Sequence, residues 1–292
     1  MTRVVLIGAT GQLGTDLCSA FGGTTFELVA LRHADMDVCD DVKVRDALAS
    51  LKPNVVINTA AFHKVELCEQ QPAQAFAVNC LAVLNLGRTC QAIGARLVHF
   101  STDYVFGGSR QTTPYTEESP PNPLNVYGVS KVAGEHCLRN ACEKHLLLRV
   151  SGLFGIAGAS GKGGNFVETM LRLGREQGTV TVVTDQVFSP TYTVDLARKV
   201  VELVEAEAQG VFHVTNSGCC SWNDFAKEIF ALARMEVEVK PTTSATFGAN
   251  VVRPGYSVLA NQRLRAQGFS DMRPWQDALA DYLAARRERA SR

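Results

Sequence analysis

Short apolar runs alternate with longer segments along the first half of the chain. Val4–Ile7 and Val55–Ile57 are continuous apolar runs, which are typical of strands buried on both faces of a parallel sheet. The longer segments between them predict crossover helices. We expect strands at residues 4–7, 26–31, 54–61 and 96–100, and helices that end at residue 21 and span 42–51 and 72–93. The pattern predicts an α/β fold with a doubly wound parallel sheet.

Helices and strands also alternate beyond residue 150. The proline-rich stretch 119–123 ends regular structure and leads into a helix that carries Tyr127 and Lys131. Further helices are expected at 165–176, at 194–207, after Ser221 and after Trp275, and strands at 179–183 and 211–214. We predict a main domain over residues 1–150, to which the chain returns around 186–210, and a smaller lobe over 151–292.

Composition narrows the class of protein. The chain has 292 residues, 46% of them hydrophobic, which supports a substantial core. Lysine plus arginine and aspartate plus glutamate both number 29, and this balance argues against a nucleic-acid polymer as partner. No apolar run approaches the roughly 20 residues that span a bilayer, so we expect a cytoplasmic protein with no membrane partner. The nine cysteines contain no Cys-x-x-Cys pair and are interpreted as small core residues, and no metal site is predicted.

A glycine pattern follows the first strand. Gly8, Gly11 and Gly14 have the spacing Gly-x-x-Gly-x-x-Gly between a strand and a helix. Such glycines let backbone amides approach a pyrophosphate at a helix N-terminus. The alternative is a tight strand-to-helix turn without a ligand. We predict a Rossmann-type dinucleotide site, formed here by Gly8, Thr10, Gly11, Gln12, Leu13 and Gly14.

The end of the second strand bears on the choice of dinucleotide. An NAD-preferring site usually has an acid about 20 residues after the glycines. Arg32 and His33 stand there instead, and their donors suit a 2′-phosphate. NADPH is therefore favoured over NADH, although Arg32 could also be a solvated loop residue. Other cofactor contacts are expected from Asp37, Val38, Ala60, Ala61 and Asn79.

A tyrosine and a lysine four residues apart are the candidate catalytic pair. Tyr127 and Lys131 share one face of the predicted helix. Because a phenol has a pKa of about 10, a nearby ammonium and a bound cationic ring would help Tyr127 to transfer a proton. Thr102 and Asp103 follow the fourth strand, where ligands of open parallel sheets bind, although such residues also cap turns.

These motifs together resemble the extended short-chain dehydrogenase/reductases, and more closely the dTDP-4-dehydrorhamnose reductase family. The resemblance extends over nearly the whole chain, through residues 164–171, 185–191, 221–226, 253–257 and 274–275. It implies NADPH-dependent reduction of the 4-keto group of a nucleotide-linked 6-deoxy sugar, with dTDP-4-dehydro-L-rhamnose as the expected substrate. In this interpretation Tyr127 donates the proton, Thr102 holds the carbonyl and Lys131 binds the nicotinamide ribose, with Asp103 as an accessory group.

The substrate side departs from the family pattern at one place. The family commonly has a tryptophan after the residue that corresponds to Ser151, whereas this chain has Gly152-Leu153-Phe154. Loss of the indole would open the pocket or let Phe154 replace it. Arg253 is a candidate for the diphosphate or for a structural salt bridge, and Asn165 is a further substrate candidate. The glycine-rich segment 158–164 predicts either a mobile loop over the substrate or an ordinary connection.

Two other functions stay open at this point. The scaffold also serves nucleotide-sugar epimerases and dehydratases, although a dehydratase usually has an acid where Tyr104 stands. A non-catalytic NADP-binding subunit, resembling the beta subunit of methionine adenosyltransferase, is the second alternative. A homodimer is the expected assembly if the protein is not a monomer.

Overall fold

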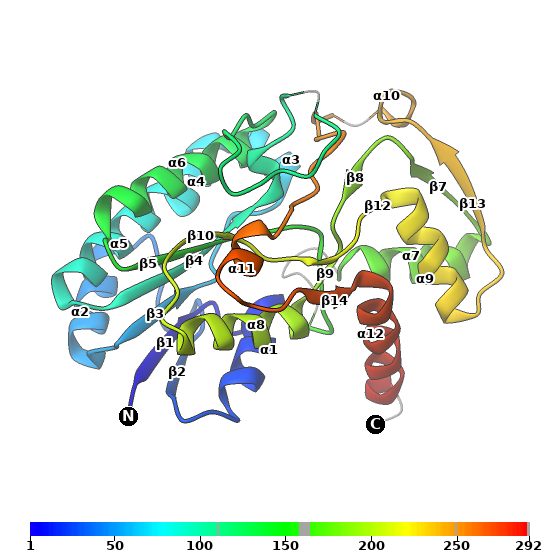
Figure 1. Cartoon of the computed structure of the whole chain (residues 1–292). Helices are drawn as coiled ribbons and strands as arrows, with labels where there is room; N and C mark the ends of the chain where they lie inside the picture. Colours follow the sequence, from blue (N-terminus) through cyan, green and yellow to red (C-terminus); the bar gives the residue numbers. More distant parts are fainter. Residues whose placement is uncertain (110, 158–163, 249, 291–292) are drawn as a thin grey trace.

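Six parallel strands form the centre of the computed structural model, which describes residues 1–109, 111–157, 164–248 and 250–290 (Figure 1). The strand order is β10-β5-β4-β3-β1-β2. The strands are β1 (Arg3–Ile7), β2 (Glu27–Leu31), β3 (Val55–Asn58), β4 (Arg96–Thr102), β5 (His145–Val150) and β10 (Gly210–His213). The predicted parallel α/β fold is confirmed.

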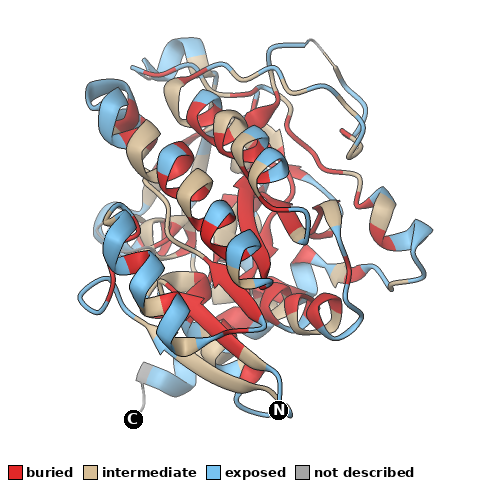
Figure 2. Cartoon of the chain, turned by 90° about the vertical axis from the view of Figure 1, so that its left-hand side faces the viewer, coloured by how far each residue is buried: buried red, intermediate tan, exposed pale blue. Residues whose placement is uncertain are grey.

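Each face of the sheet is covered by helices because successive side chains of a buried strand point to opposite sides. Val4 and Leu6 pack with α1 (Gln12–Phe21) and α8 (Thr193–Glu205) in one core. Val5 and Ile7 pack in a second core with α2 (Asp41–Leu51), α5 (Ala82–Ile93) and α6 (Val126–Ala141). Figure 2 shows the buried strands between helices whose outer faces are exposed.

The helix expected over 72–93 is divided into three consecutive parts. It begins as α4 (Pro72–Phe76), passes through a π-helical turn at Ala77–Leu81 and continues as α5. The short α3 (Val65–Gln70) precedes it. The π-helical turn contains Asn79, and such turns often occur at functional sites.

The chain returns to the central sheet through α8 and β10. β10 pairs in parallel with β5, from Gly210 opposite Leu146 to His213 opposite Arg149. The sixth strand therefore extends three residues beyond the expected return at 186–210. The division into domains at residue 150 stays a prediction.

The C-terminal lobe has its own core, which is rich in aromatic side chains. Helices α7 (Phe166–Gln177), α9 (Trp222–Ala233) and α12 (Trp275–Ala290) pack with the parallel pair β7 (Thr179–Val183) and β13 (Glu238–Thr242). Shorter elements complete the lobe: β6 (Leu153–Phe154), β8 (Val187–Phe188), β9 (Thr191–Tyr192), β11 (Asn216–Ser217), β12 (Cys220–Ser221), α10 (Ser244–Phe247) and β14 (Met272–Pro274). Helix α11 (Gln262–Ala266) packs instead against the central sheet, where Leu264 joins the core on the α1 side. Residues 158–163 of the predicted glycine-rich loop lie outside the described residues.

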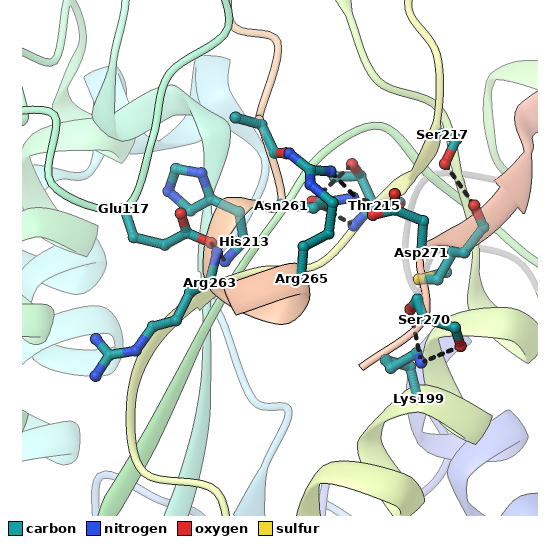
Figure 3. Close-up of polar contacts among 12 residues, drawn as sticks. Glu117, Lys199, His213, Thr215, Ser217, Asn261, Arg263, Arg265, Ser270 and Asp271 are labelled. Atoms are coloured by element: carbon teal, nitrogen blue, oxygen red, sulfur yellow. Dashed lines mark hydrogen bonds and ion pairs between the residues drawn. The ribbon is translucent and has the colours of Figure 1, made fainter. Parts of the chain in front are cut away.

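Polar contacts join the segment around α11 to the edge of the sheet (Figure 3). The carboxylate of Glu117 accepts the backbone N–H groups of His213 and Arg263, both at 3.0 Å. The side chain of Asn261 donates to the carbonyl of Thr215 at 2.8 Å. His213 is fully buried and burial lowers its pKa to about 3, so its interpretation as a packed core residue is confirmed.

The cysteine interpretation holds for part of the set. Five cysteines are buried, at positions 68, 80, 90, 142 and 220. Cys39 and Cys219 are exposed, so their interpretation as core residues is wrong. Both lie in short connections, where a small side chain has no packing requirement.

Candidate functional site

A cavity of about 1320 Å³ lies at the carboxyl ends of the central strands and extends to the C-terminal lobe. Its lining combines the glycine turn, the catalytic candidates and lobe residues. From the sequence candidates the lining includes Gly8, Thr10, Gly11, Gln12, Leu13, Gly14, Asp37, Val38, Ala60, Ala61, Thr102, Asp103, Tyr127, Lys131, Phe154, Asn165 and Arg253. Most predicted site residues are therefore brought together.

The glycine turn leads into α1 with its backbone close to the cavity. A Cβ atom at Gly14 would lie 2.1 Å from the carbonyl oxygen of Gly8, so the turn and the helix approach too closely for any side chain there. Gly11 is the N-cap of α1, and among the described residues no side chain accepts a capping hydrogen bond from the first amides of the helix. Free amides at a helix N-terminus suit a pyrophosphate.

The end of β2 has a more complex arrangement than expected. His33, Asp37 and Val38 line the cavity, whereas Arg32 is not among the described lining residues. The guanidinium of Arg32 donates from Nε and Nη2 to Asp35 at 2.9 and 3.0 Å. This hydrogen-bonded arginine lowers the pKa of Asp35 to about 2. Contact of Arg32 with a 2′-phosphate stays a prediction, and would require the side chain to leave Asp35.

The helix that carries the candidate catalytic pair begins at a well-formed cap. The side chain of Asn125 accepts the N–H of Gly128 at 2.9 Å, which starts α6 immediately before Tyr127. The ring of Tyr127 meets that of Tyr104 edge to face, with centroids 5.9 Å apart. One turn further on, Lys131 is buried and its ammonium donates to the carbonyl of Phe100 at 2.7 Å.

The pKa values of this pair differ from the sequence expectation. Burial raises the pKa of Tyr127, and a hydrogen bond from Thr102 opposes this shift only in part. Burial lowers the pKa of Lys131 to about 8, against the attraction of Glu135. Burial thus dominates both shifts, and the expected lowering of the Tyr127 pKa stays a prediction for the cofactor-bound protein.

Thr102 and Asp103 form the start of a buried hydroxyl network. The hydroxyl of Thr102 lies 3.2 Å from Asp103 Oδ1 and accepts the N–H of Tyr104 at 3.2 Å. Asp103 Oδ2 accepts hydrogen bonds from Ser151 at 2.9 Å and Ser257 at 2.6 Å. Burial raises the pKa of Asp103 to about 6 despite these donors. Thr102 therefore both caps a 3₁₀ turn, as the alternative interpretation stated, and faces the cavity.

Asn79 is placed differently from the other predicted cofactor contacts. It is fully buried and is not among the described lining residues of the cavity. Its amide exchanges two 2.9 Å hydrogen bonds with the backbone of Phe62 and donates to Ser130 Oγ at 3.0 Å. Asn79 thus connects the segment after β3 to α6, and a cofactor contact by its side chain stays a prediction.

The predicted substrate residues have structural partners of their own. Asn165 caps α7 by accepting the N–H of Glu168 at 3.1 Å. Arg253 forms an ion pair with Glu66 at the cavity, which matches the salt-bridge alternative. Phe154 is 1% exposed and stacks on Tyr192, with centroids 5.5 Å apart, so most of its ring belongs to the core of the lobe.

Sequence reasoning did not identify the aromatic wall of the cavity. Phe188 and Trp222 line it and stack with centroids 3.8 Å apart. A Cβ atom at Gly152 would lie 2.3 Å from Phe188, so this ring fills the place of the side chain that residue 152 lacks. Phe154 lines the same cavity, and its contact with the sugar stays a prediction. The sequence signal that could have pointed to this wall is the tryptophan at the start of the helix predicted after Ser221.

The chain is similar to known proteins over nearly its whole length. A family model described as RmlD substrate binding domain matches residues 1–288. This chain belongs to the RmlD substrate binding domain family. The family resemblance inferred from the sequence motifs is confirmed.

Relatives of this RmlD-family chain match it over almost their whole length. SpsK, a spore coat polysaccharide biosynthesis protein of Bacillus subtilis, is 38% identical over 98% of each chain. A dTDP-4-dehydrorhamnose reductase of Streptomyces griseus is 38% identical over 99% of this chain and 96% of its own. The structure of a Bacillus anthracis dTDP-4-dehydrorhamnose reductase in complex with NADP covers 98% of this chain and 100% of its own, with a TM-score of 0.92 and 36% identity.

Two further features bear on partners of this RmlD-family chain. Across the part of the chain that the structure describes, no helix is both long and apolar enough to cross a bilayer. The same residues contain no group of three or more side chains that could hold a metal ion. A more distant likeness, to the NAD complex of a Thermus thermophilus UDP-glucose 4-epimerase at 22% identity and a TM-score of 0.83, concerns the fold alone.

Proposed function

We propose that this protein uses NADPH to reduce the 4-keto group of a nucleotide-linked 6-deoxy sugar, with dTDP-4-dehydro-L-rhamnose as substrate and dTDP-L-rhamnose as product. The observation that carries this proposal is a single cavity that contains the glycine turn, Thr102, Tyr127 and Lys131. The near full-length relatives named dTDP-4-dehydrorhamnose reductase support the same reaction.

The residues present fit a dinucleotide cofactor. The close approach at Gly14 and the uncapped amides of α1 suit a pyrophosphate, and Ala60 and Ala61 leave room beside it. When bound, NADPH supplies the hydride. His33 and Asp37 line the cavity beyond the glycine turn, where an adenosine would lie.

Tyr127 is the proposed proton donor to the oxygen that develops at sugar C4. Thr102 favours the ionised form of Tyr127, and both residues line the same cavity. Thr102 would hold the carbonyl oxygen, and this hydrogen bond strengthens as negative charge develops. Lys131, held by the Phe100 carbonyl, would provide the positive charge that stabilises the tyrosinate and so favours release of the proton from Tyr127.

Asp103 has a supporting role in this proposal. Its carboxylate is buried and accepts two serine hydroxyls in addition to its contact with Thr102. These contacts fix the orientation of Thr102 rather than reach the reacting atoms. Arg253 is the proposed contact for the diphosphate, and for that contact it would exchange Glu66 for phosphate oxygens.

The experiment that tests the proposal is consumption of NADPH by purified protein with dTDP-4-dehydro-L-rhamnose. Stoichiometric oxidation of NADPH is expected. An epimerase or dehydratase would convert the sugar without net loss of NADPH, and a non-catalytic NADP-binding subunit would bind NADPH without either change. A cytoplasmic location and a homodimer stay predictions, for which fractionation and sedimentation are the tests.

A further inference from the structure

An aromatic pair faces the cavity next to a glycine that has no room for a side chain. Gly152 has a φ of +52°, a backbone conformation that side chains rarely adopt. A Cβ atom there would lie 2.3 Å from Cε2 and 2.5 Å from Cδ2 of Phe188. The Phe188 ring therefore packs flat over the backbone of residue 152.

The position of Phe188 is fixed by local strand pairing. Strand β8 pairs antiparallel with β12, and this pairing places Phe188 opposite Cys220. Trp222 follows β12 directly and donates its backbone N–H to the carbonyl of Gln186 at 3.3 Å. The two rings are consequently stacked at 3.8 Å with an interplanar angle of 22°.

Other aromatic side chains hold the Trp222 indole from behind. Its ring centroid lies 4.5 Å from that of Phe166 and 6.3 Å from that of Phe225. Phe188 is 3% exposed, whereas Trp222 is only half-buried and lines the cavity. The indole is thus a rigid apolar surface that is still open to a ligand.

A short chain of contacts connects this surface to the reacting groups. Ser151, which precedes Gly152, donates to Asp103, and Asp103 in turn contacts Thr102. The wall made by Phe188 and Trp222 therefore faces the same cavity as Thr102 and Tyr127 and is joined to Thr102 through Gly152, Ser151 and Asp103.

We infer that Trp222, backed by Phe188, is a specificity-determining residue that packs against the apolar face of the 6-deoxy sugar. The inference rests on the proposed function, because it takes the sugar to be held at Thr102 and Tyr127. A deoxy sugar presents C–H groups and a methyl group, which an indole face covers well. A sugar with a hydroxyl at C6 would place a polar group against this wall without a partner.

The two tryptophans of the chain offer a direct binding assay. Trp222 lies at the cavity, whereas Trp275 is 5% exposed and packs against Phe225 in the lobe core. We would titrate the protein, without cofactor, with dTDP-L-rhamnose and with dTDP, and follow tryptophan emission. Trp275→Phe is the matched control.

The expected result is a change in emission with dTDP-L-rhamnose in the parent and in Trp275→Phe, and loss of that change in Trp222→Phe. The change with dTDP alone should be much smaller. An equal change with dTDP would show that the indole meets the base or diphosphate instead of the sugar, which overturns the inference.

Steady-state kinetics provides the second readout. Trp222→Ala should lower kcat/KM for the 6-deoxy sugar about 10- to 200-fold, mainly through KM, and leave NADPH affinity unchanged. Trp222→Phe keeps an apolar ring and guards against a folding defect in the alanine variant. Unchanged kcat/KM in a folded Trp222→Ala protein would refute the specificity role of Trp222 but not the reductase activity. A change in Trp222 emission in a parent protein that does not turn over the sugar would refute the reductase activity alone.

Discussion

The ammonium of Lys131 lies 3.2 Å from Nε2 of His99, beneath the candidate catalytic tyrosine. Both side chains are buried, and the second ring nitrogen of His99 lies 3.3 Å from the side-chain amide of Asn58. Burial and the nearby lysine lower the pKa of His99 well below its usual value, so the ring is neutral. His99 therefore holds Lys131 without adding a second charge.

Replacement of His99 tests this positioning role. His99→Leu leaves a buried ammonium with one partner fewer, a loss worth about 1–3 kcal/mol, so kcat should fall about 10-fold or more. His99→Gln retains a hydrogen-bonding group and should recover most of the rate. Equal rates in the leucine and glutamine variants would contradict the role, provided that both bind NADPH normally.

Titration of Lys131 should appear in the pH dependence of the reaction. Its pKa is lowered to about 8 by burial, and its neighbours are neutral His99 on β4 and Glu135 on α6, which is paired with Arg149 of β5. Since Lys131 acts as a cation, kcat/KM should decrease above about pH 8. A profile that stays flat to pH 10 would show that the charge of Lys131 is not required.

Tyr127→Phe separates proton donation from binding. The variant should bind NADPH as the parent does but turn over about 10²- to 10⁴-fold more slowly, because that is the usual contribution of a positioned acid. The adjacent ring at Tyr104 supplies a comparison, since Tyr104→Phe should keep most of the rate. A large loss of rate in Tyr104→Phe with a normal rate in Tyr127→Phe would identify Tyr104 as the proton donor.

Titration of Asp103 should make the free energy of unfolding depend on pH. Its pKa in the folded protein is about 6, above the usual value, so the folded state binds more protons than the unfolded state between about pH 4 and 6. The free energy of unfolding should therefore fall as the pH rises through this window, by up to about 1.4 kcal/mol per unit. Urea denaturation at several pH values should show that this pH dependence of the free energy of unfolding is absent from Asp103→Asn. The same slope of free energy against pH in both proteins would rule out a contribution from Asp103.

Cofactor choice depends on whether Arg32 leaves Asp35. Arg32→Ala should narrow the preference for NADPH over NADH, because it removes the proposed donor to the 2′-phosphate. Asp35→Asn weakens the competing pair and should widen the preference. Binding titrations with NADPH and NADH measure this preference. Equal affinities of the parent protein for the two cofactors would exclude a contact of Arg32 with the 2′-phosphate.

Local sequence patterns were enough to predict most of the fold. Buried strands such as Val4–Ile7 and the turn at Gly8–Gly14 depend on adjacent residues, so the sequence indicated them directly. The Arg32–Asp35 pair was equally local, and its three-residue spacing was a signal that could have been used. The contact of Phe188 with Gly152 depends on how the lobe folds back, and no periodicity in the sequence indicates it.

The sequence did not indicate the surroundings of some predicted site residues, for a physical reason. The spacing of Tyr127 and Lys131 placed both on one helix face, but their pKa shifts depend on burial where α6 packs against β4, which a helical pattern does not report. Asn79 lies in a π-helical turn and its amide bonds to Phe62 and Ser130, which the sequence did not indicate, and its contact with the cofactor stays a prediction.

The most direct test of the reductase proposal is isotope transfer. NADPH deuterated at the reactive nicotinamide carbon is incubated with the protein and dTDP-4-dehydro-L-rhamnose, and the product is analysed by NMR. The proposal predicts one deuterium at sugar C4 and one NADPH oxidised for each sugar reduced. A converted sugar without deuterium at C4, or binding of NADPH without any conversion, would contradict it.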